Sequence, residues 1–172
     1  MTEILSLINE LIKEHQQILQ NAQAAVQVAN DASAILELDR AKDDFVPGRF
    51  GDQQQSLQSL QESLEIIDKG LQAHFEREET ALLAAFEKHG GKPLVSALHS
   101  LLSEHEDLRE RLTHAQKHVT ELTSGNLSRH AWEASAHDMR AHLSHTLKLI
   151  EAHSHREQEL FHKLRSALMK TT

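Results

Sequence analysis

Four histidines and two glutamates interrupt the apolar stripes of this chain at positions that face the core of a helical protein. They are His15, His74, Glu78, His105, His153 and Glu157. Two stretches place a His and a Glu four residues apart, as His74-Phe-Glu-Arg-Glu78 and His153-Ser-His-Arg-Glu157. On a helix this spacing puts both side chains on one face. Because buried imidazoles and carboxylates need compensation, the pattern favours a metal ion.

The composition predicts that long helices position these residues. Only 3% of the 172 residues are aromatic, and the chain has 2 Pro and 6 Gly. It is therefore poor in strand formers and in helix breakers, and rich in residues that favour helices. We predict an all-α fold.

Apolar residues recur at three- and four-residue spacing in four segments, as on core-facing helices. We predict helices from about Glu3 to Asn30, Gln53 to His89, Pro93 to Ser124 and Ser128 to Leu168. The stripe of the first is expected to be Leu5, Ile8, Ile12, His15, Leu19 and Ala22. Short links force antiparallel neighbours, so residues 1–172 are predicted to form a single domain, an up-down-up-down four-helix bundle. The stretch from Asp31 to Gly51 either extends the first helix or connects it to the second.

The six polar residues should also lie at one depth in such a bundle. Counted inward from the helix ends nearest one face, at about 1.5 Å per residue, all six lie roughly 17–22 Å deep. His118 and His142 lie nearly 40 Å deep by the same count. Shared depth predicts one layer of metal ligands and excludes His118 and His142 from it.

Charge and cysteine usage limit the classes of function. The net charge is −8 with Lys and Arg scattered along the chain, so we expect no nucleic-acid binding. There is no Cys, which excludes disulfides and thiol chemistry. The first residues mix acidic with apolar side chains, and no apolar run approaches 18 residues, so we expect no membrane span and a cytoplasmic location.

Four motifs together resemble the hemerythrin-like, or HHE cation-binding, domain family. They are LIKEHQQIL around His15, then HFEREETALL, SEHEDLRERL and HSHREQELF. The resemblance spans most of the chain and implies a hemerythrin-like four-helix bundle with a non-haem di-iron centre. It implies two iron ions bridged by Glu78 and Glu157, and by an oxide or hydroxide. His15 and His74 would bind one iron, and His105 and His153 the other.

The chain departs from the oxygen carriers of that family at one position. Those proteins have a His four residues before the one matching His105, and this chain has Leu101 there. Each iron would then keep an open position, which favours ligand exchange or reactivity over reversible oxygen binding. Glu79 and Glu104 are the alternative candidates for the missing ligand.

The function implied is binding or sensing of oxygen, peroxide or nitric oxide, in iron handling or in oxidative or nitrosative stress. A di-iron enzyme, such as a peroxidase, an oxidase or a protein that repairs iron centres, is the second hypothesis. A metal-stabilised interaction module is the third, and no protein partner is indicated. Because imidazole and carboxylate also suit zinc and manganese, the ligand types alone leave the metal open.

The residues also allow simpler interpretations. The six could be core side chains that satisfy one another without a metal, although for six in one layer this is the weaker hypothesis. A second group of histidines, His114, His118, His142 and His145, either faces solvent or forms another metal site or a pH-sensitive patch. The charged ERE and HEDLRER stretches are expected to face solvent.

Overall fold

The computed structural model describes residues 2–40 and 51–170 of the chain, and within these ranges it contains helices and no strand. The elements are α1 (Thr2–Arg40), α2 (Gly51–Arg77), the π-helical turn η1 (Glu78–Leu82), α3 (Leu83–His89), α4 (Gly91–Leu102), α5 (His105–Thr123) and α6 (Arg129–Lys170). The prediction of an all-α protein is confirmed.

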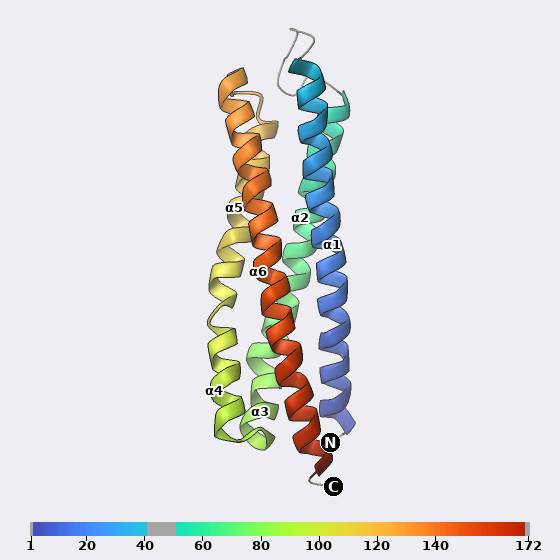
Figure 1. The fold of residues 1–172 in the computed structure, drawn as a ribbon, viewed down its shortest axis with the longest axis vertical. Helices are drawn as coiled ribbons and strands as arrows, with labels where there is room; N and C mark the ends of the chain where they lie inside the picture. Colours follow the sequence, from blue (N-terminus) through green and yellow to red (C-terminus); the bar gives the residue numbers. More distant parts are fainter. Residues whose placement is uncertain (1, 41–50, 171–172) are drawn as a thin grey trace.

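The helices pack side by side as an elongated bundle (Figure 1). α2, η1 and α3 follow one another as one rod, and α4 and α5 form another beside it. α1 contacts α2 and α6, while α5 contacts the same two helices from the opposite side. Both termini lie at the end of the bundle where α3 turns into α4. Side chains from all four rods therefore face a shared interior.

The predicted helix ends are mostly close to the observed ones. α1 continues past Asn30 to Arg40, and α2 already begins at Gly51. Pro93 lies in the first turn of α4, as predicted. Gly91 has a φ of +68°, a left-handed conformation that glycine adopts without strain. Ser128 accepts a hydrogen bond from the backbone N–H of Ala131 at 3.3 Å, as an N-cap residue does, which agrees with the predicted start of this helix. The rest of the predicted connector, residues 41–50, lies outside the described part of the chain.

The single helix predicted from Pro93 to Ser124 is wrong, because it is interrupted after Leu102. The N–H of Glu104 bonds to the carbonyl of Leu101 at 2.9 Å, a tighter turn than that of an α-helix. The Ser103 hydroxyl also donates to the Ser100 carbonyl at 2.7 Å. Such local side-chain bonds compete with helical pairing. The interruption lies directly before His105, the first residue of α5.

A π-helical turn interrupts the second predicted helix, which had been expected to run unbroken to His89. The turn begins at Glu78, and the N–H of Leu83 bonds back to the Glu78 carbonyl five residues earlier. Single π-turns inside α-helices occur frequently at functional sites. Beyond it, Leu82, Ala85 and Phe86 are again buried, so the core stripe continues.

The core consists of two apolar clusters stacked along the bundle. The larger is built mainly from α1, α2, α5 and α6, and includes Leu64, Leu112 and Ile150. The smaller, towards the termini, includes Phe86 and Phe161. The six polar residues singled out in the sequence belong to neither cluster.

The predicted stripe of α1 is correct at Ile8, His15 and Ala22 and shifted elsewhere. Leu11 and Ile18 are buried, whereas Leu5, Ile12 and Leu19 are only half-buried beside the core. A stripe wider than a single row explains the difference, because adjacent apolar residues share the edge of the buried face.

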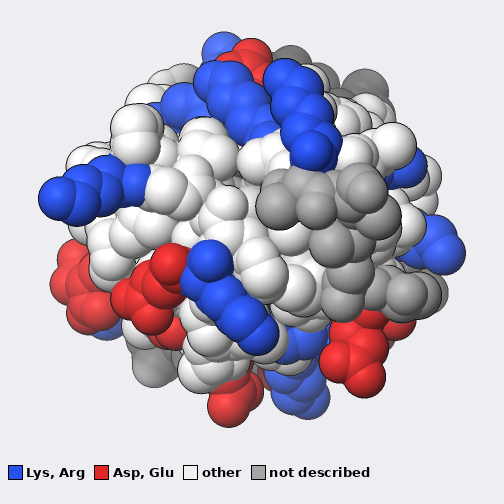
Figure 2. Space-filling model, turned by 90° about the horizontal axis from the view of Figure 1, so that it is seen from below, with Lys and Arg blue, Asp and Glu red and all other residues white. Residues whose placement is uncertain are grey.

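The surface has mixed charge where it is visible from the end that carries the termini. In Figure 2, several Lys and Arg side chains lie next to one another along the upper edge, while most Asp and Glu side chains lie in the lower half, together with further Lys and Arg. Among the described residues, no helix has the length and apolar character that crossing a membrane requires.

Truncation of a core side chain near the termini should destabilise the bundle. Leu98 is completely buried in the smaller cluster, so Leu98→Ala should lower the free energy of unfolding by about 2–5 kcal/mol. Urea unfolding followed by circular dichroism measures this. Ile66→Ala, at a side chain that is 58% exposed, is the control and should change stability by less than about 0.5 kcal/mol. Equal effects of the two substitutions would contradict the assigned core.

Candidate metal centre

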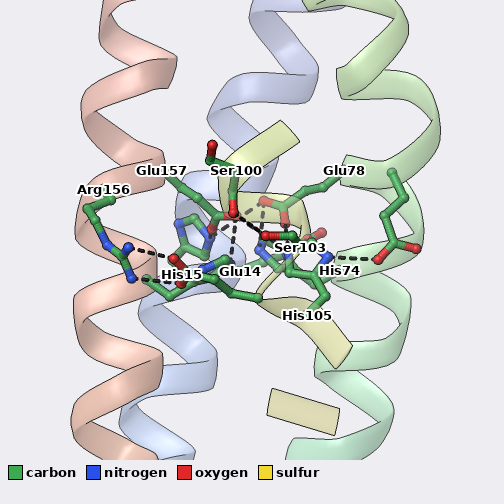
Figure 3. A network of polar contacts seen from close by, with 12 residues as sticks. Glu14, His15, His74, Glu78, Ser100, Ser103, His105, Arg156 and Glu157 are labelled. Carbon is green, nitrogen blue, oxygen red and sulfur yellow. Dashed lines mark hydrogen bonds and ion pairs between the residues drawn. The ribbon is translucent and has the colours of Figure 1, made fainter. Parts of the chain in front are cut away.

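The six polar residues identified from the sequence meet in one buried layer across the bundle (Figure 3). His15 comes from α1, His74 from α2, Glu78 from η1, His105 from α5, and His153 and Glu157 from α6. Each is at most 2% exposed. We call these six residues the His/Glu layer. The structure thus brings the whole predicted set together, and its binding of metal stays a prediction.

The Nε2 atoms of the four imidazoles all face the two carboxylates. His74 Nε2 lies 3.0 Å from Glu78 Oε1, and His153 Nε2 lies 2.8 Å from Glu157 Oε1. His15 Nε2 lies 2.9 Å from Glu157 Oε2 and 3.7 Å from Glu78 Oε1. His105 Nε2 lies 3.4 Å from Glu78 Oε2 and 3.6 Å from Glu157 Oε1. Each carboxylate is therefore shared between imidazoles of different helices.

Two groups of donor atoms can be distinguished within the layer. The first contains His15 and His74, and the second contains His105 and His153. Both groups include Glu78 and Glu157, and within each group one donor atom per residue lies within 4.8 Å of the others. Two positions with shared carboxylates therefore lie side by side, and each could hold a metal ion.

The donor atoms that face these two positions fit a cation better than they fit one another. All four Nε2 atoms and all four carboxylate oxygens are buried, and none is aligned with a hydrogen-bond partner. An unsatisfied buried polar group costs about 1–3 kcal/mol, and more if it is charged. Imidazole nitrogen with carboxylate oxygen suits iron, manganese or zinc.

Three of the four imidazoles are oriented from behind by a further carboxylate. The Nδ1–H groups donate to Glu14 from His74 at 2.9 Å, to Glu79 from His105 at 2.7 Å, and to Glu104 from His153 at 3.0 Å. A hydrogen bond at Nδ1 fixes the tautomer and leaves the Nε2 lone pair free for a metal. The Nδ1 hydrogen bonds of these three rings therefore resemble those of metal-binding histidines.

An arginine holds each of these three outer carboxylates in turn. The pairs are Arg77 with Glu14, Arg109 with Glu79, and Arg156 with Glu104. Arg156 binds both oxygens of Glu104, at 2.6 and 2.7 Å. Arg109 also lies 5.1 Å above the ring centre of Phe75, which stacks on His105 with a centroid distance of 3.8 Å. The orientation of the imidazoles thus depends on side chains at the surface.

These contacts give the positions of Glu79 and Glu104. Both carboxylates bond to Nδ1, on the side of the ring away from the layer, so neither faces the Nε2 atoms. Leu101, at the place of the missing histidine, is buried in the smaller apolar cluster. The layer therefore has an apolar neighbour at that position.

The outer contacts also correct one expectation from the sequence. The ERE and HEDLRER stretches were expected to face solvent, but Arg77 in the first and Arg109 in the second bind the outer carboxylates of Glu14 and Glu79. The sequence contains a signal that could have identified these outer carboxylates. Glu14, Glu79 and Glu104 each stand next to a layer residue in the sequence, and on a helix an adjacent residue lies at the border of the buried face.

The layer is built from two similar halves. α1 with α2 contributes Glu14-His15 and the H-x-x-R-E motif that ends at Glu78, while α5 with α6 contributes Glu104-His105 and the same motif ending at Glu157. In both halves the Glu of the Glu-His pair bonds to the His and the Arg of the motif. Equivalent residues thus make equivalent contacts on opposite sides of the layer.

His15 is the exception to this symmetry. Its Nδ1 atom is buried and has no hydrogen-bond partner, and its ring stacks on Phe161 with a centroid distance of 5.8 Å. The sequence explains the difference, because the residue that corresponds to Glu79 in the other half is Gln158. The position beside His15 therefore lacks the outer carboxylate present behind the other three imidazoles.

The electrostatics of the layer favour positive charge between the carboxylates. Burial alone would lower the pKa of His105, but the carboxylates of Glu157, Glu78 and Glu79 outweigh it and raise that pKa to about 9. Burial likewise opposes the charged form of His74 and His153, yet adjacent carboxylates raise the pKa of both. Burial would raise the pKa of Glu157, but the surrounding imidazoles hold it well below its usual range. Without metal, protons on the imidazoles balance the carboxylates.

The histidines outside the layer divide into two kinds. His155 is exposed although it stands two residues from His153, as expected from helical geometry. His114, His118 and His142 lie together between α5 and α6, with ring-centre distances of 4.5 to 6.3 Å. His145, grouped with them from the sequence, is exposed, and no ring contact joins it to these three in the described structure.

Comparisons of this chain with protein-family models, with curated proteins and with solved structures found no match.

The metal-free protein should lose stability as the pH rises from 6 to 9.5. The pKa of His105 is raised from 6.5 to about 9, so its protonation stabilises the fold fully below pH 6.5 and ceases to do so above about pH 9. The shift corresponds to about 3 kcal/mol, and His74 and His153 act in the same direction.

Urea unfolding of the chelator-treated protein across this range measures the effect. His155→Ala, at an exposed histidine outside the layer, should leave the pH profile unchanged. A free energy of unfolding that is constant or rises between pH 6 and 9.5 would contradict protonated imidazoles in the layer.

Proposed function

We propose that this chain is a hemerythrin-like protein that binds two iron ions in the His/Glu layer and uses them to bind or sense oxygen, peroxide or nitric oxide. The observation that carries the proposal is the sharing of two buried carboxylates by two groups of inward-facing imidazoles. A single structural ion would not need two such groups. The four sequence motifs resemble those of the HHE cation-binding family, and this resemblance supports iron as the metal.

The proposed ligand set follows the two groups. His15 and His74 would hold one ion, His105 and His153 the other, and Glu78 and Glu157 would be shared by both. When bound, a pair of iron ions supplies redox chemistry and coordination positions that can take a small diatomic ligand or peroxide. With four imidazoles and two carboxylates, this set leaves more such positions than a set with a fifth histidine at Leu101.

The chain's own residues prepare the layer for this role. Glu14, Glu79 and Glu104 keep the Nε2 atoms directed inward, so little reorganisation accompanies binding. Apolar clusters on both sides of the layer exclude water from it. Because the imidazoles carry protons in the metal-free state, binding of cations should release protons.

The arrangement of the rods also supports the proposal. α1, the α2–α3 rod, the α4–α5 rod and α6 follow one another around the bundle, with the two termini at one end. This is the order expected for the up-down-up-down bundle of the hemerythrin type. Bundles of this kind build dinuclear carboxylate sites from inward-facing side chains on several helices.

Metal analysis of freshly purified protein tests the proposal. We expect about two irons per chain and a near-ultraviolet and visible spectrum that changes on exposure to air or nitric oxide. A reversible, stoichiometric spectral change supports binding or sensing. Peroxide turnover well above that of free iron would show instead that the protein is an enzyme. One zinc per chain and an unchanged spectrum would reject the proposal in favour of a structural module.

Substitution of a shared carboxylate should remove the metal. Glu78→Ala eliminates a donor common to both groups, so iron content should fall from about two to well below one per chain. Glu76→Ala, at an exposed residue of the same helix, is the matched control and should retain two. Circular dichroism verifies that both variants fold, and Glu78→Gln replaces Glu78→Ala if it does not. A folded Glu78 variant with two irons would contradict the ligand set.

Removal of the carboxylate behind His105 should lower the affinity for one of the two ions only. Glu79→Gln leaves the layer intact but exchanges the acceptor at His105 Nδ1, and loss of such a partner typically lowers metal affinity about 10–100-fold. Titration of metal-free protein with Mn²⁺ should show one of two binding steps weakened.

Glu106→Gln, at an exposed neighbouring residue, controls for the change of charge and should leave both steps as in the wild type. Equal weakening of both steps by Glu79→Gln, or of neither, would show that the outer carboxylate does not act on a single position.

A further inference from the structure

A second group of histidines lies well away from the His/Glu layer. His114 and His118 stand four residues apart on α5, and His142 faces them from α6. Counted along the helices, each of these residues lies roughly 14–20 Å from the nearest layer residue of its own helix. The proposal for the layer does not involve them.

The three rings are in mutual contact at the boundary between core and solvent. The centroid of His114 lies 4.5 Å from that of His118 and 4.8 Å from that of His142, and His118 and His142 are 6.3 Å apart. Three imidazoles bound to one tetrahedral ion have centroids roughly 5 Å apart, because the bonds from zinc to nitrogen are about 2.0–2.1 Å. Two of the three centroid distances are close to this value and the third is longer. In the described structure the three residues do not bring one donor atom each within 4.8 Å of one another, so a single ion requires the rings to turn.

The hydrogen bonds of the group leave nitrogen atoms free for such an ion. His142 Nε2–H donates to the Arg111 carbonyl at 3.0 Å, which leaves the Nδ1 lone pair available, as in metal-binding histidines. The Nδ1 atom of His118 is buried and has no hydrogen-bond partner. Both nitrogens are thus available to a ligand from the side of the group.

The surroundings of His114 disfavour its charged form, which could not bind a metal. Desolvation and the neighbouring His118 and His142, together with Lys117, lower the pKa of His114, while Glu121 opposes this. Among the described residues, no carboxylate forms an ion pair with any of the three imidazoles. Imidazole nitrogens are ligands for borderline-soft divalent ions.

We propose that His114, His118 and His142 form a second metal site, which binds one divalent ion of the zinc class. His114 meets the other two rings edge to face, whereas His118 and His142 are nearly parallel. Binding therefore requires rotation of side chains, for which the exposed His114 has room. A water molecule would complete the coordination. Because its donors are imidazoles alone, this site selects Zn²⁺, Ni²⁺ or Cu²⁺ over the harder ions that carboxylates favour.

Equilibrium dialysis of the full chain against Zn²⁺, with metal already present in the protein counted first, tests this proposal. Wild type should bind one zinc more than His114→Ala or His118→Ala at the same free Zn²⁺. His145→Ala, which removes an exposed histidine outside the group, should bind as much as wild type. Equal binding by all four proteins would overturn the proposal.

The role of His142 separates a three-histidine site from an ordinary pair on one helix. His142→Ala should weaken this zinc about tenfold or more, an effect of the size seen when a metal loses a supporting group. Unchanged affinity in His142→Ala would overturn the three-residue site. Iron content is measured on the same samples and should be equal in all variants, so failure of this site and failure of the His/Glu layer remain distinguishable.

Discussion

Two carboxylates without access to water dominate the physical chemistry of this protein. Glu78 and Glu157 are completely buried between two apolar clusters, and a buried charge is tolerated only when it is paired. Protons on the surrounding imidazoles can supply the compensating charge, as the raised pKa of His105 indicates. Metal cations can supply it as well, from the same positions. The layer is therefore a place where protons and cations compete.

This constraint extends outward to the surface of the bundle. An imidazole that must direct Nε2 inward presents Nδ1–H outward, and a buried donor needs an acceptor. Glu14, Glu79 and Glu104 are the acceptors, and each is held by an arginine. Surface pairs of this kind contribute little to stability by themselves. Their significance here is that they fix the rings of the layer.

Repetition explains how one chain builds this arrangement. The Glu-His pair and the H-x-x-R-E motif occur once in each half, and they make the same contacts on both sides of the layer. The repetition is incomplete at His15, where Gln158 takes the place that Glu79 has in the other half. The two proposed metal positions, which are otherwise equivalent, differ for this reason. We therefore expect the two ions to bind with different affinities.

The layer could be predicted from the sequence because helical periodicity fixes both the face and the depth of a residue. Polar residues on an apolar stripe are conspicuous, and counting along four rods placed six of them together. The interruption at Ser103 and Glu104 could not be predicted in this way, since it depends on local hydrogen bonds within a sequence of good helix formers. The π-turn at Glu78 leaves the apolar stripe unbroken and so gave no signal.

The outer carboxylates were not predicted for a different reason. Glu79 and Arg109 belong to charged stretches of the kind that usually faces solvent. The bonds of Glu79 to His105 and to Arg109 depend on the rotation of each rod about its axis. Periodicity gives that rotation only approximately. The contact among His114, His118 and His142 joins two rods, and it was left open for the same reason.

Anomalous diffraction from crystals of the iron-loaded protein, recorded on both sides of the iron absorption edge, tests the central claim most directly. The account predicts two iron peaks within the His/Glu layer, one beside His15 and His74 and the other beside His105 and His153. A single peak, peaks outside the layer, or a layer without iron would contradict it.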